Sequence, residues 1–358
     1  MINNRERFLK TMRFEAVDHP PLLVPGPWAT TRRRWEREGL PAGVSLEEYF
    51  GVESFSMKPI GIDTLLFPPF EEKVLSETGD YVIKINAKGA KVRNVKDETS
   101  MPEFLEYAIK GPEDLTWLRE RLNPDSPGRT KPSWLAEAKA RQDAGAVMFC
   151  NGGMYFSFLN EYMGTERTMY TYFDHPEFVH QVNDMLCTLC ERALRTALPS
   201  FQLDDVGYHE DMAYRNGSII SPVMFREFMT PYYKRITGIT DRHGIDLHVM
   251  DSDGDIRELI PLWLECGINC FLPLEVAAGM DVVKLRAQYG RDIAMIGGFD
   301  KRILAQGKQE IRQELERIRP VIEGGGYIPN CDHGVPHDVP FENVCFFVEY
   351  LKSTYGMR

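Results

Sequence analysis

Polar side chains able to do chemistry recur at one kind of place in this chain, directly after short apolar runs that predict strands. They combine carboxylates, imidazoles, a thiol, an amide and a phenol: Asn151, Tyr155, Glu210, Asp211, His248, Asp251, Asp253, Glu275, Cys331 and His333. Carboxylates that lie close together repel one another unless a cation or a shared proton offsets their charge. If the strands end at one mouth, this pattern predicts a catalytic or metal-binding centre there.

A divalent metal ion would offset the carboxylates directly, and a mixture of His, Cys and Asp side chains suits zinc. We therefore take five residues as candidate ligands: His248, Asp251, Asp253, Cys331 and His333. Their spacing matches no short zinc motif, because H-V-M-D-S-D and C-D-H lie far apart in the chain. Other roles stay open: His248 as a hydrogen-bonded core histidine, one of the aspartates as a helix N-cap, and Cys331 as a buried thiol.

Four residues are candidates for acid–base or electrostatic work on a substrate: Glu210, Asp211, Glu275 and His333. Asn151 and Tyr155 follow a predicted strand and are candidates for substrate binding. The arginine-rich stretch TTRRRWEREG contains Arg32 and Arg33, which could hold an anionic substrate, and a solvent-exposed helix face is the alternative. We expect His248, one of the aspartates, Glu275 and His333 to face one another.

The elements that must position these residues follow a rhythm of a short apolar run, a turn and an amphipathic helix. Six such units predict strands at 146–150, 204–208, 245–250, 268–274, 292–298 and 325–330. Weaker candidates at 20–25 and 52–58 bring the number of strands to eight. Eight alternating units favour a closed (β/α)8 TIM barrel, the α/β fold whose active sites lie at the carboxyl ends of its strands. No G-x-G-x-x-G follows the first strand, which argues against a dinucleotide-binding sheet.

One segment breaks this rhythm. Residues 72–96 alternate between polar and apolar side chains and carry turn signals at T-G-D and K-G, which predicts an inserted antiparallel β-hairpin. The polar, proline-containing stretch 97–130 is typical of a surface helix with linkers. We expect residues 1–358 to form a single barrel domain from which the hairpin projects.

Composition excludes several classes of protein. The 358 residues carry a net charge of −11, which argues against nucleic-acid binding, because phosphates attract basic faces. No run approaches the ~20 apolar residues of a membrane span, and the polar start MINNRERFLKTM has no apolar export segment. We therefore expect a cytoplasmic protein with no membrane partner. Seven cysteines favour reduced thiols, and Cys187 and Cys190 lie in a helical pattern that predicts core packing.

The chain resembles the uroporphyrinogen decarboxylase superfamily over nearly its full length, more clearly after residue 200. The segments that carry the resemblance include EDMAYRNGSIISPVMFREFMTPYYK, LHVMDSDGDIRELIP, PLEVAAGMDVVKLR, IGGFDKRIL and GGYIPNCDHGVPHDVPFENV. The resemblance implies a (β/α)8 barrel, in agreement with the rhythm of the strands. It also implies one of two activities, because the superfamily includes porphyrinogen decarboxylases and zinc-dependent methyltransferases that work with methylated corrinoids.

The chain departs from the motifs of both the decarboxylases and the methyltransferases, and these departures indicate which branch of the superfamily it resembles more. The decarboxylases grip substrate carboxylates with an R-Q-A-G-R-Y segment, and GPWATTRRRW lacks it, although D-H-G-V matches their late G-H-G-I element at His333. The methyltransferases bind zinc through H-x-C and a later cysteine. Here methionine replaces the cysteine after His248, and the later position falls on His333. An alternative alignment puts Asp251 and Asp253 at the H-x-C positions. The resemblance thus implies an altered ligand set in a divergent branch nearer to the methyltransferases.

We therefore expect a zinc-dependent methyltransferase that moves a methyl group between a small substrate and a corrinoid carried by a partner protein. A cofactor-free decarboxylase of a porphyrinogen-like or other polycarboxylate substrate is the first alternative. A non-catalytic barrel that binds a tetrapyrrole or a corrinoid is the second, although such a site favours apolar walls over carboxylates. A homodimer is compatible with all three hypotheses.

Overall fold

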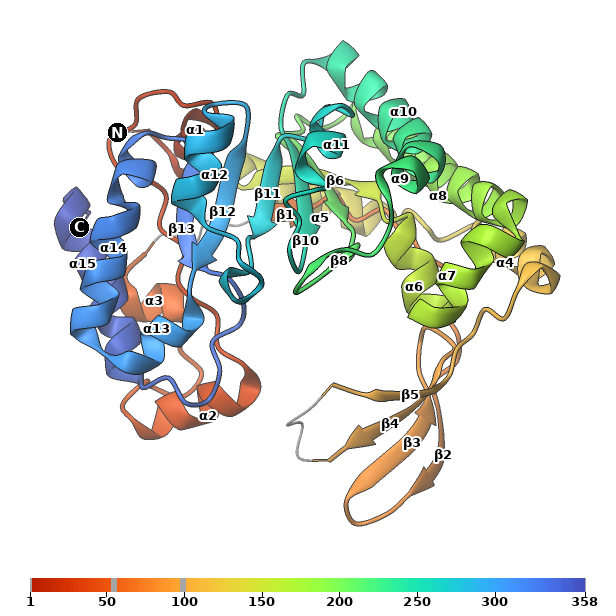
Figure 1. Cartoon of the computed structure of the whole chain (residues 1–358), viewed down its shortest axis with the longest axis horizontal. Coiled ribbons are helices and arrows are strands. Elements are labelled where there is room, and N and C mark those ends of the chain that lie inside the picture. Colours follow the sequence, from red (N-terminus) through yellow and green to blue (C-terminus); the bar gives the residue numbers. More distant parts are fainter. Residues whose placement is uncertain (1, 53–56, 97–100, 358) are drawn as a thin grey trace.

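The core of the protein is one parallel sheet of seven strands, in the order β1-β6-β7-β10-β11-β12-β13 (Figure 1). The computed structural model describes residues 2–52, 57–96 and 101–357. The strands are β1 (Met57–Pro59), β6 (Val147–Gly153), β7 (Asp205–His209), β10 (His248–Ser252), β11 (Cys270–Pro273), β12 (Ala294–Phe299) and β13 (Tyr327–Cys331). All six strongly predicted strands are thus confirmed. Of the weaker prediction at 52–58, residues 53–56 lie outside the described part, and β1 occupies its end.

Helices follow the strands and cover the outer face of the sheet, as the rhythm of the sequence predicts (Figure 1). They are α2 (Ala29–Arg37), α3 (Leu46–Phe50), α4 (Leu115–Arg121), α5 (Pro132–Asp143), α6 (Phe156–Met163), α7 (Thr165–Asp174), α8 (Pro176–Ala197), α9 (Pro222–Phe228), α10 (Thr230–Thr240), α11 (Ile260–Leu264), α12 (Val282–Tyr289), α13 (Lys301–Gln306), α14 (Lys308–Glu323) and α15 (Phe341–Tyr355). Short 3-10 turns are η1 (Pro112–Asp114), η2 (Asp241–His243) and η3 (Val276–Ala278).

The sheet curves around an apolar interior. Val147 of β6 lies in the same buried cluster as Ile296 of β12 and Ile328 of β13, although these strands are far apart in the order of the sheet. Phe8 and Met12 of helix α1 (Asn4–Met12) complete this cluster. A larger cluster lies between the sheet and the helices. Two apolar layers, one inside and one outside the same sheet, are the arrangement of a (β/α) barrel, and the predicted fold class is confirmed.

The eighth predicted strand, at 20–25, forms no ladder. Leu23 packs against the interior cluster, and just beyond the segment Pro27 makes a parallel bridge with Val335. Three of the six residues in PPLLVP are prolines, which have no N–H to donate, and this limits a ladder on either side. Among the described residues, no ladder closes the sheet between β13 and β1.

The inserted segment is larger than the predicted hairpin. It forms a four-stranded antiparallel sheet that projects from the barrel below α6 and α7 (Figure 1). Its strands are β2 (Lys73–Glu77), β3 (Tyr81–Ile85), β4 (Lys91–Val95) and β5 (Glu103–Glu106). The prediction of linkers from residue 97 onward is therefore wrong at 103–106, where a four-residue strand pairs with β4. A second, two-stranded sheet joins β8 (Ala213–Tyr214) to β9 (Gly217–Ser218).

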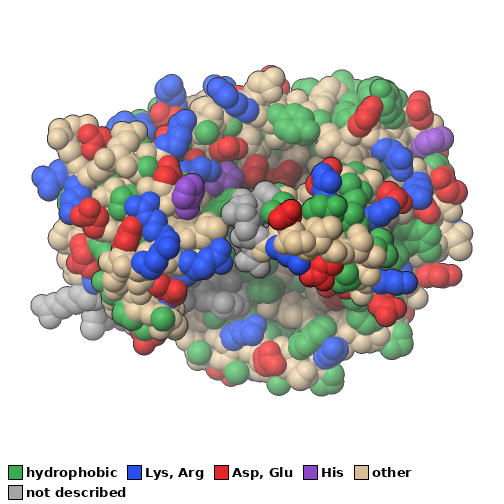
Figure 2. Space-filling model, turned by 90° about the horizontal axis from the view of Figure 1, so that it is seen from below, with side chains coloured by type: hydrophobic (Ala, Val, Ile, Leu, Met, Phe, Trp, Pro, Cys, Tyr) green, Lys and Arg blue, Asp and Glu red, His purple; other side chains and the backbone are tan. Residues whose placement is uncertain are grey.

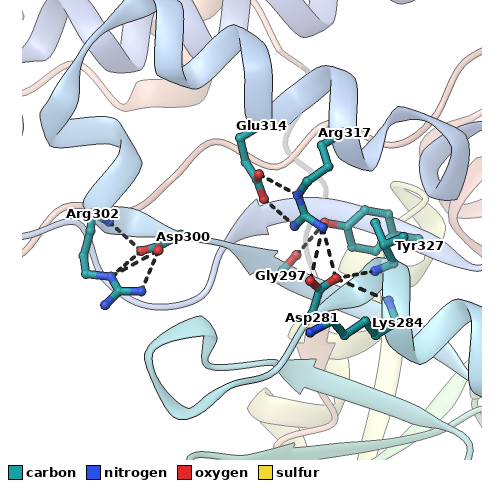
Figure 3. A network of polar contacts seen from close by, with 9 residues as sticks. Asp281, Lys284, Gly297, Asp300, Arg302, Glu314, Arg317 and Tyr327 are labelled. Atoms are coloured by element: carbon teal, nitrogen blue, oxygen red, sulfur yellow. Dashed lines mark hydrogen bonds and ion pairs between the residues drawn. The ribbon is translucent and has the colours of Figure 1, made fainter.

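Polar contacts connect the last strand–helix units of the barrel, around α12, α13 and α14 (Figure 3). Asp281 accepts hydrogen bonds from two backbone N–H groups at the start of α12, and its Oδ1 lies 3.1 Å from a guanidinium nitrogen of Arg317 on α14. Arg317 also pairs with Glu314 at 2.7 Å. Asp300 caps α13 and pairs with Arg302 at 2.7 Å. Within the described ranges, no helix combines the length and apolarity needed to cross a bilayer.

Candidate active site

The loops that follow the strands lie on one side of the barrel, because parallel strands all end at the same face. Figure 2 shows the molecule from this side, the lower side in Figure 1. The surface is hollowed near its middle, and histidine and acidic side chains lie beside the hollow. A candidate residue reaches this mouth only if its side chain leaves the strand on the side that faces the mouth.

His248 lies between the sheet and helix α10, away from the mouth. Its Nδ1 is 3.1 Å from the hydroxyl of Tyr208, and its Nε2 is 3.1 Å from the hydroxyl of Thr240. Burial lowers the pKa of His248 to about 4, so the ring is neutral at physiological pH. Both ring nitrogens are therefore engaged in a core contact. The structure does not bring His248 to the shared site expected for it, and the core interpretation describes its position.

Asp251 leaves β10 on the opposite side, and Asp253 follows directly after the end of the strand. Val249 belongs to the interior cluster and Met250 to the cluster under the helices, so successive side chains alternate between the two layers. Asp251 and Asp253 follow Val249 at intervals of two residues and reach the mouth. Of the two possible alignments with H-x-C, only the one that uses these aspartates faces the mouth, because Met250 is fully buried in the core.

A third imidazole, His209 at the end of β7, lies among these carboxylates. Its Nδ1 is 3.4 Å from Asp251 Oδ2, and its Nε2 is 3.6 Å from Asp211 Oδ2 and 4.0 Å from Glu161 Oε1. The hydrogen bond to Asp251 and the neighbouring negative charges raise the pKa of His209 to about 9, against the effect of burial. His209 is therefore an imidazolium at neutral pH, with a proton to donate. The sequence places it after a strand, but we assigned it no role.

Asp253 and His333 form a second pair, with Nε2 of the ring 3.0 Å from Oδ1 of the carboxylate. Their hydrogen bond lowers the pKa of Asp253 and raises that of His333. The other ring nitrogen of His333, Nδ1, is buried and has no hydrogen-bond partner in the described part of the chain. Asp211 links the two pairs, because it lies beside His209 and accepts a hydrogen bond of 3.3 Å from the N–H of Asp253. Burial raises the pKa of Asp211.

Glu210 and Tyr155 lie behind the mouth, where they join α6 to β7. Glu210 is fully buried, and its Oε1 accepts hydrogen bonds from the N–H of Tyr155 at 2.6 Å and the hydroxyl of Tyr233 at 2.9 Å. Its Oε2 accepts one from the N–H of Ser157 at 2.9 Å. Burial raises the pKa of Glu210 to about 7. The hydroxyl of Tyr155 donates to the carbonyl of Gly152, so both side chains are occupied in structural contacts.

Glu275 and Asn151 shape loops at the strand ends. Oε2 of Glu275 accepts a hydrogen bond of 3.1 Å from the N–H of Gly254, in the loop that carries Asp253. Gly254 has a φ of +84°, and a Cβ there would lie 2.6 Å from the carbonyl oxygen of Ala213, so the turn requires glycine. Asn151 donates to the hydroxyl of Thr64 at 2.7 Å. Glu275 is thus placed to hold the loop that presents Asp253.

Cys331 points away from the mouth. Its side chain belongs to the cluster under the helices, and burial raises the pKa of the thiol well above its usual range, so the thiol keeps its proton. The structure therefore does not place Cys331 as a ligand at the mouth. The neighbouring Asp332, to which we assigned no role, is buried and accepts hydrogen bonds from the N–H groups of Val276 at 3.0 Å and Lys301 at 3.3 Å. It joins the loops that follow three successive strands.

The two predicted substrate-binding arginines differ in position. Arg32 on α2 pairs with Glu36 at 2.9 Å and donates to the carbonyl of Val44, which matches the expectation of a surface helix face. Arg33 lines a cavity of about 710 Å³ between α2 and the loop after β13. Of the two, only Arg33 stands where a bound molecule could reach it.

The side chains at the mouth that could bind a metal ion are arranged in pairs. Among the residues that the structure describes, no group of three or more His, Cys, Asp or Glu side chains is arranged to hold a metal ion. A zinc site with a cysteine thiolate among its ligands does not fit, because the thiol of Cys331 is buried and protonated. His248 is also excluded as a ligand at the mouth, because it is hydrogen-bonded in the core. Oxygen and nitrogen donors fit in type at Asp253 and His333, where Oδ1 and Nε2 lie 3.0 Å apart.

Two residues that the sequence did not single out connect the inserted sheet to this centre. Glu161 on α6 lies 4.0 Å from Nε2 of His209. Lys88, in the turn between β3 and β4, forms an ion pair with Glu161. Both are ordinary charged residues in a helix and a turn, and only the fold brings them together. The inserted sheet therefore reaches the edge of the mouth.

Comparisons with known proteins match the larger part of the chain. The family model described as uroporphyrinogen decarboxylase (URO-D) matches residues 77–354. Uroporphyrinogen decarboxylase 2, chloroplastic, of Oryza sativa subsp. japonica is 24% identical over 184 residues, 51% of this chain and 44% of that protein. Uroporphyrinogen decarboxylase of Nitrosococcus oceani is 27% identical over 191 residues, 51% of this chain and 49% of that protein. The chain thus spans about half the length of the curated relatives it matches.

Among solved structures, the chain is similar to a methyltransferase from Methanosarcina mazei. The two superpose with a TM-score of 0.61, covering 99% of this chain and 100% of the other. Their sequences are 14% identical, so the likeness concerns the fold. The match extends over the whole barrel.

Proposed function

The chain belongs to the uroporphyrinogen decarboxylase family, and from this premise we propose that it is a methyltransferase that moves a methyl group between a small molecule and a corrinoid carried by a partner protein. We further propose that a divalent metal ion, zinc by preference, binds at Asp253 and His333. Membership of the family is the reason to expect an enzyme, and the structural neighbour named as a methyltransferase supports the choice of reaction.

The pair formed by Asp253 and His333 is the observation that carries this proposal. An ion held between Nε2 of His333 and Oδ1 of Asp253, which lie 3.0 Å apart, would replace the proton that they share, and a nitrogen and a carboxylate oxygen suit a borderline divalent ion. Asp251 is held by His209, so the further positions of such an ion would be open to water or to substrate. Catalytic zinc sites combine three protein ligands with one open position, so a site built on Asp253 and His333 needs one further ligand.

A zinc ion bound at this pair would supply a Lewis acid for the heteroatom that carries the methyl group. The chain itself supplies the proton. When the bond between the methyl carbon and the heteroatom breaks, the heteroatom keeps the electron pair and needs a proton, which the imidazolium of His209 can donate. Asp251 and Asp211 hold the ring on its two sides, and Glu275 keeps the loop that carries Asp253 in place.

Metal analysis combined with a methyl-transfer assay tests this function. We expect zinc to copurify with the protein near stoichiometry. We also expect methylcobalamin to form from cob(I)alamin when a panel of methylated small molecules is supplied. His333→Ala should lose metal retention and methyl transfer together, whereas Glu275→Gln should lower turnover and keep the metal. Asp255→Asn is the matched control, because Asp255 lies on the same loop but pairs with Arg257.

Two outcomes would count against the proposal. One is wild-type protein that transfers methyl groups without bound metal. The other is a His333→Ala variant that loses activity while its metal content is unchanged, because His333 would then act only in proton transfer.

A cofactor-free decarboxylase is the second candidate, and the position of His209 favours it. After carbon dioxide leaves a substrate, the carbon that carried it keeps the electron pair and needs a proton, and an imidazolium held by three carboxylates is placed to give one. The curated relatives named as uroporphyrinogen decarboxylases point the same way. Release of carbon dioxide from uroporphyrinogen by metal-free protein, lost in His209→Gln, would favour this candidate over methyl transfer.

A further inference from the structure

A cavity of about 710 Å³ lies beside the acidic mouth, between helix α2 and the loop that follows β13. It is lined by Trp28, Thr30, Arg33, Arg34, Arg37, Pro336 and His337. None of these residues belongs to the pairs that His209 and His333 form with aspartates. The volume falls within the range of about 300–1,000 Å³ that small-molecule sites occupy.

The helical wall of this cavity is positively charged. Arg33 and Arg37 are one turn apart, and like charges at this spacing repel one another. Arg34 lies between them and pairs with Glu38. Arg37 is exposed, and its charge contributes to the lowered pKa of Glu38. In a chain with a net charge of −11, this concentration of guanidinium groups creates a local field that attracts anions.

The rest of the lining is apolar and flat. Trp28, directly before α2, is 47% exposed, and Pro336 and His337 line the same space from the loop after β13. Any Cβ at position 334 would lie 2.6 Å from the indole, so Gly334 is what allows Trp28 to take this position. An exposed indole beside guanidinium groups can pack against a flat apolar body.

Hydrogen bonds connect the two walls of the cavity. The N–H of Trp28 and the hydroxyl of Thr31 donate to the carbonyl of Val335, at 3.2 and 2.8 Å. The N–H of Val335 donates to the carbonyl of Gly26 at 2.8 Å, and the indole of the buried Trp35 donates to the carbonyl of Val339 at 2.9 Å. A preformed cavity of this kind orders few groups on binding.

We propose that this cavity is a binding site for an aromatic anion, a molecule with a flat ring system and one carboxylate, sulfonate or phosphate group. The ring packs against Trp28 and Pro336, and the anionic group lies toward Arg37. Binding here does not depend on the proposed methyl transfer.

Calorimetric titration with a matched pair of probes tests this site. The probes are 1-naphthalenesulfonate and the neutral 1-naphthalenemethanol, which share one ring system. We expect saturable binding of the sulfonate, and binding of the neutral compound weaker by about tenfold or more, because a charge-assisted contact is lost. Arg37→Gln should weaken binding of the sulfonate by about tenfold and leave binding of the neutral compound unchanged. Trp28→Ala should weaken both, and Trp28→Phe should restore part of the loss.

Arg141→Gln provides the control for charge alone, since Arg141 is an exposed arginine on α5 that pairs with Glu137. Its affinity for the sulfonate should equal that of the wild type. The proposal is overturned if neither probe binds saturably, if both bind equally well, or if Arg37→Gln and Arg141→Gln weaken binding to the same extent. Thermal melting curves of each variant show whether a loss of binding reflects a loss of folding.

Discussion

Replacing Asp251 by asparagine tests the electrostatic role of the carboxylate nearest to His209. The change removes a charge 3.4 Å from Nδ1 of the ring and leaves the size of the side chain unchanged. His209 is half-buried, so an effective dielectric constant of about 40 is appropriate, and the interaction is then about 2 kcal/mol, or about 1.5–2 pKa units. Asp211 stays 3.6 Å from Nε2. We therefore expect the pKa of His209 to fall from about 9 toward its usual value of 6.5 without going below it.

Titration of the histidine ring protons by NMR in metal-free protein measures this shift, with His209→Gln to assign the signal. Asp255→Asn is the control, and the pKa of His209 should not change in it. Because folding raises this pKa, the contribution of His209 to stability is present below pH 6.5 and is lost as the pH rises through about 9. In Asp251→Asn this contribution should be smaller, and its loss should be complete at lower pH. A pKa that stays near 9 in Asp251→Asn, or falls equally in both variants, would refute the assigned pairing.

Two further predictions concern buried carboxyl groups. Folding raises the pKa of Glu210 from 4.5 to about 7. Between pH 5 and pH 8 the free energy of unfolding of the wild type should therefore fall by about 3 kcal/mol more than that of Glu210→Gln. Urea unfolding at pH 5 and at pH 8 measures this difference. Equal losses in the two proteins would show that Glu210 does not take up a proton on folding. Asp205 is fully buried, neither of its oxygens has a partner in the described part, and burial raises its pKa, so it should be neutral at pH 7. Asp205→Asn should then change the free energy of unfolding by less than about 1 kcal/mol at pH 7, and a larger destabilisation would indicate an ionised, partnered carboxylate.

The sequence predicts most of the barrel because each strand–helix unit is a local pattern. Six apolar runs bounded by turns become β6, β7, β10, β11, β12 and β13. The weaker candidates show the limit of this signal. Residues 20–25 have the apolar content of a strand, but their prolines cannot complete a ladder, whereas the short β5 forms because β4 offers it a partner. Pairing with a neighbour, which no local pattern records, decides such cases.

For the site, the sequence by itself determined that carboxylates and imidazoles gather at the strand ends, and it included Asp251, Asp253 and His333 among the candidates. Only the tertiary structure decided which of them meet. His248 and Cys331 fit the same pattern but lie under the helices, and His209 becomes central through the carboxylates around it. A parallel barrel strand is buried on both faces, so apolar content does not distinguish the face toward the mouth from the face toward the helices. The alternation along β10 separates its side chains into two sets, and the curvature of the sheet determines which set faces the mouth.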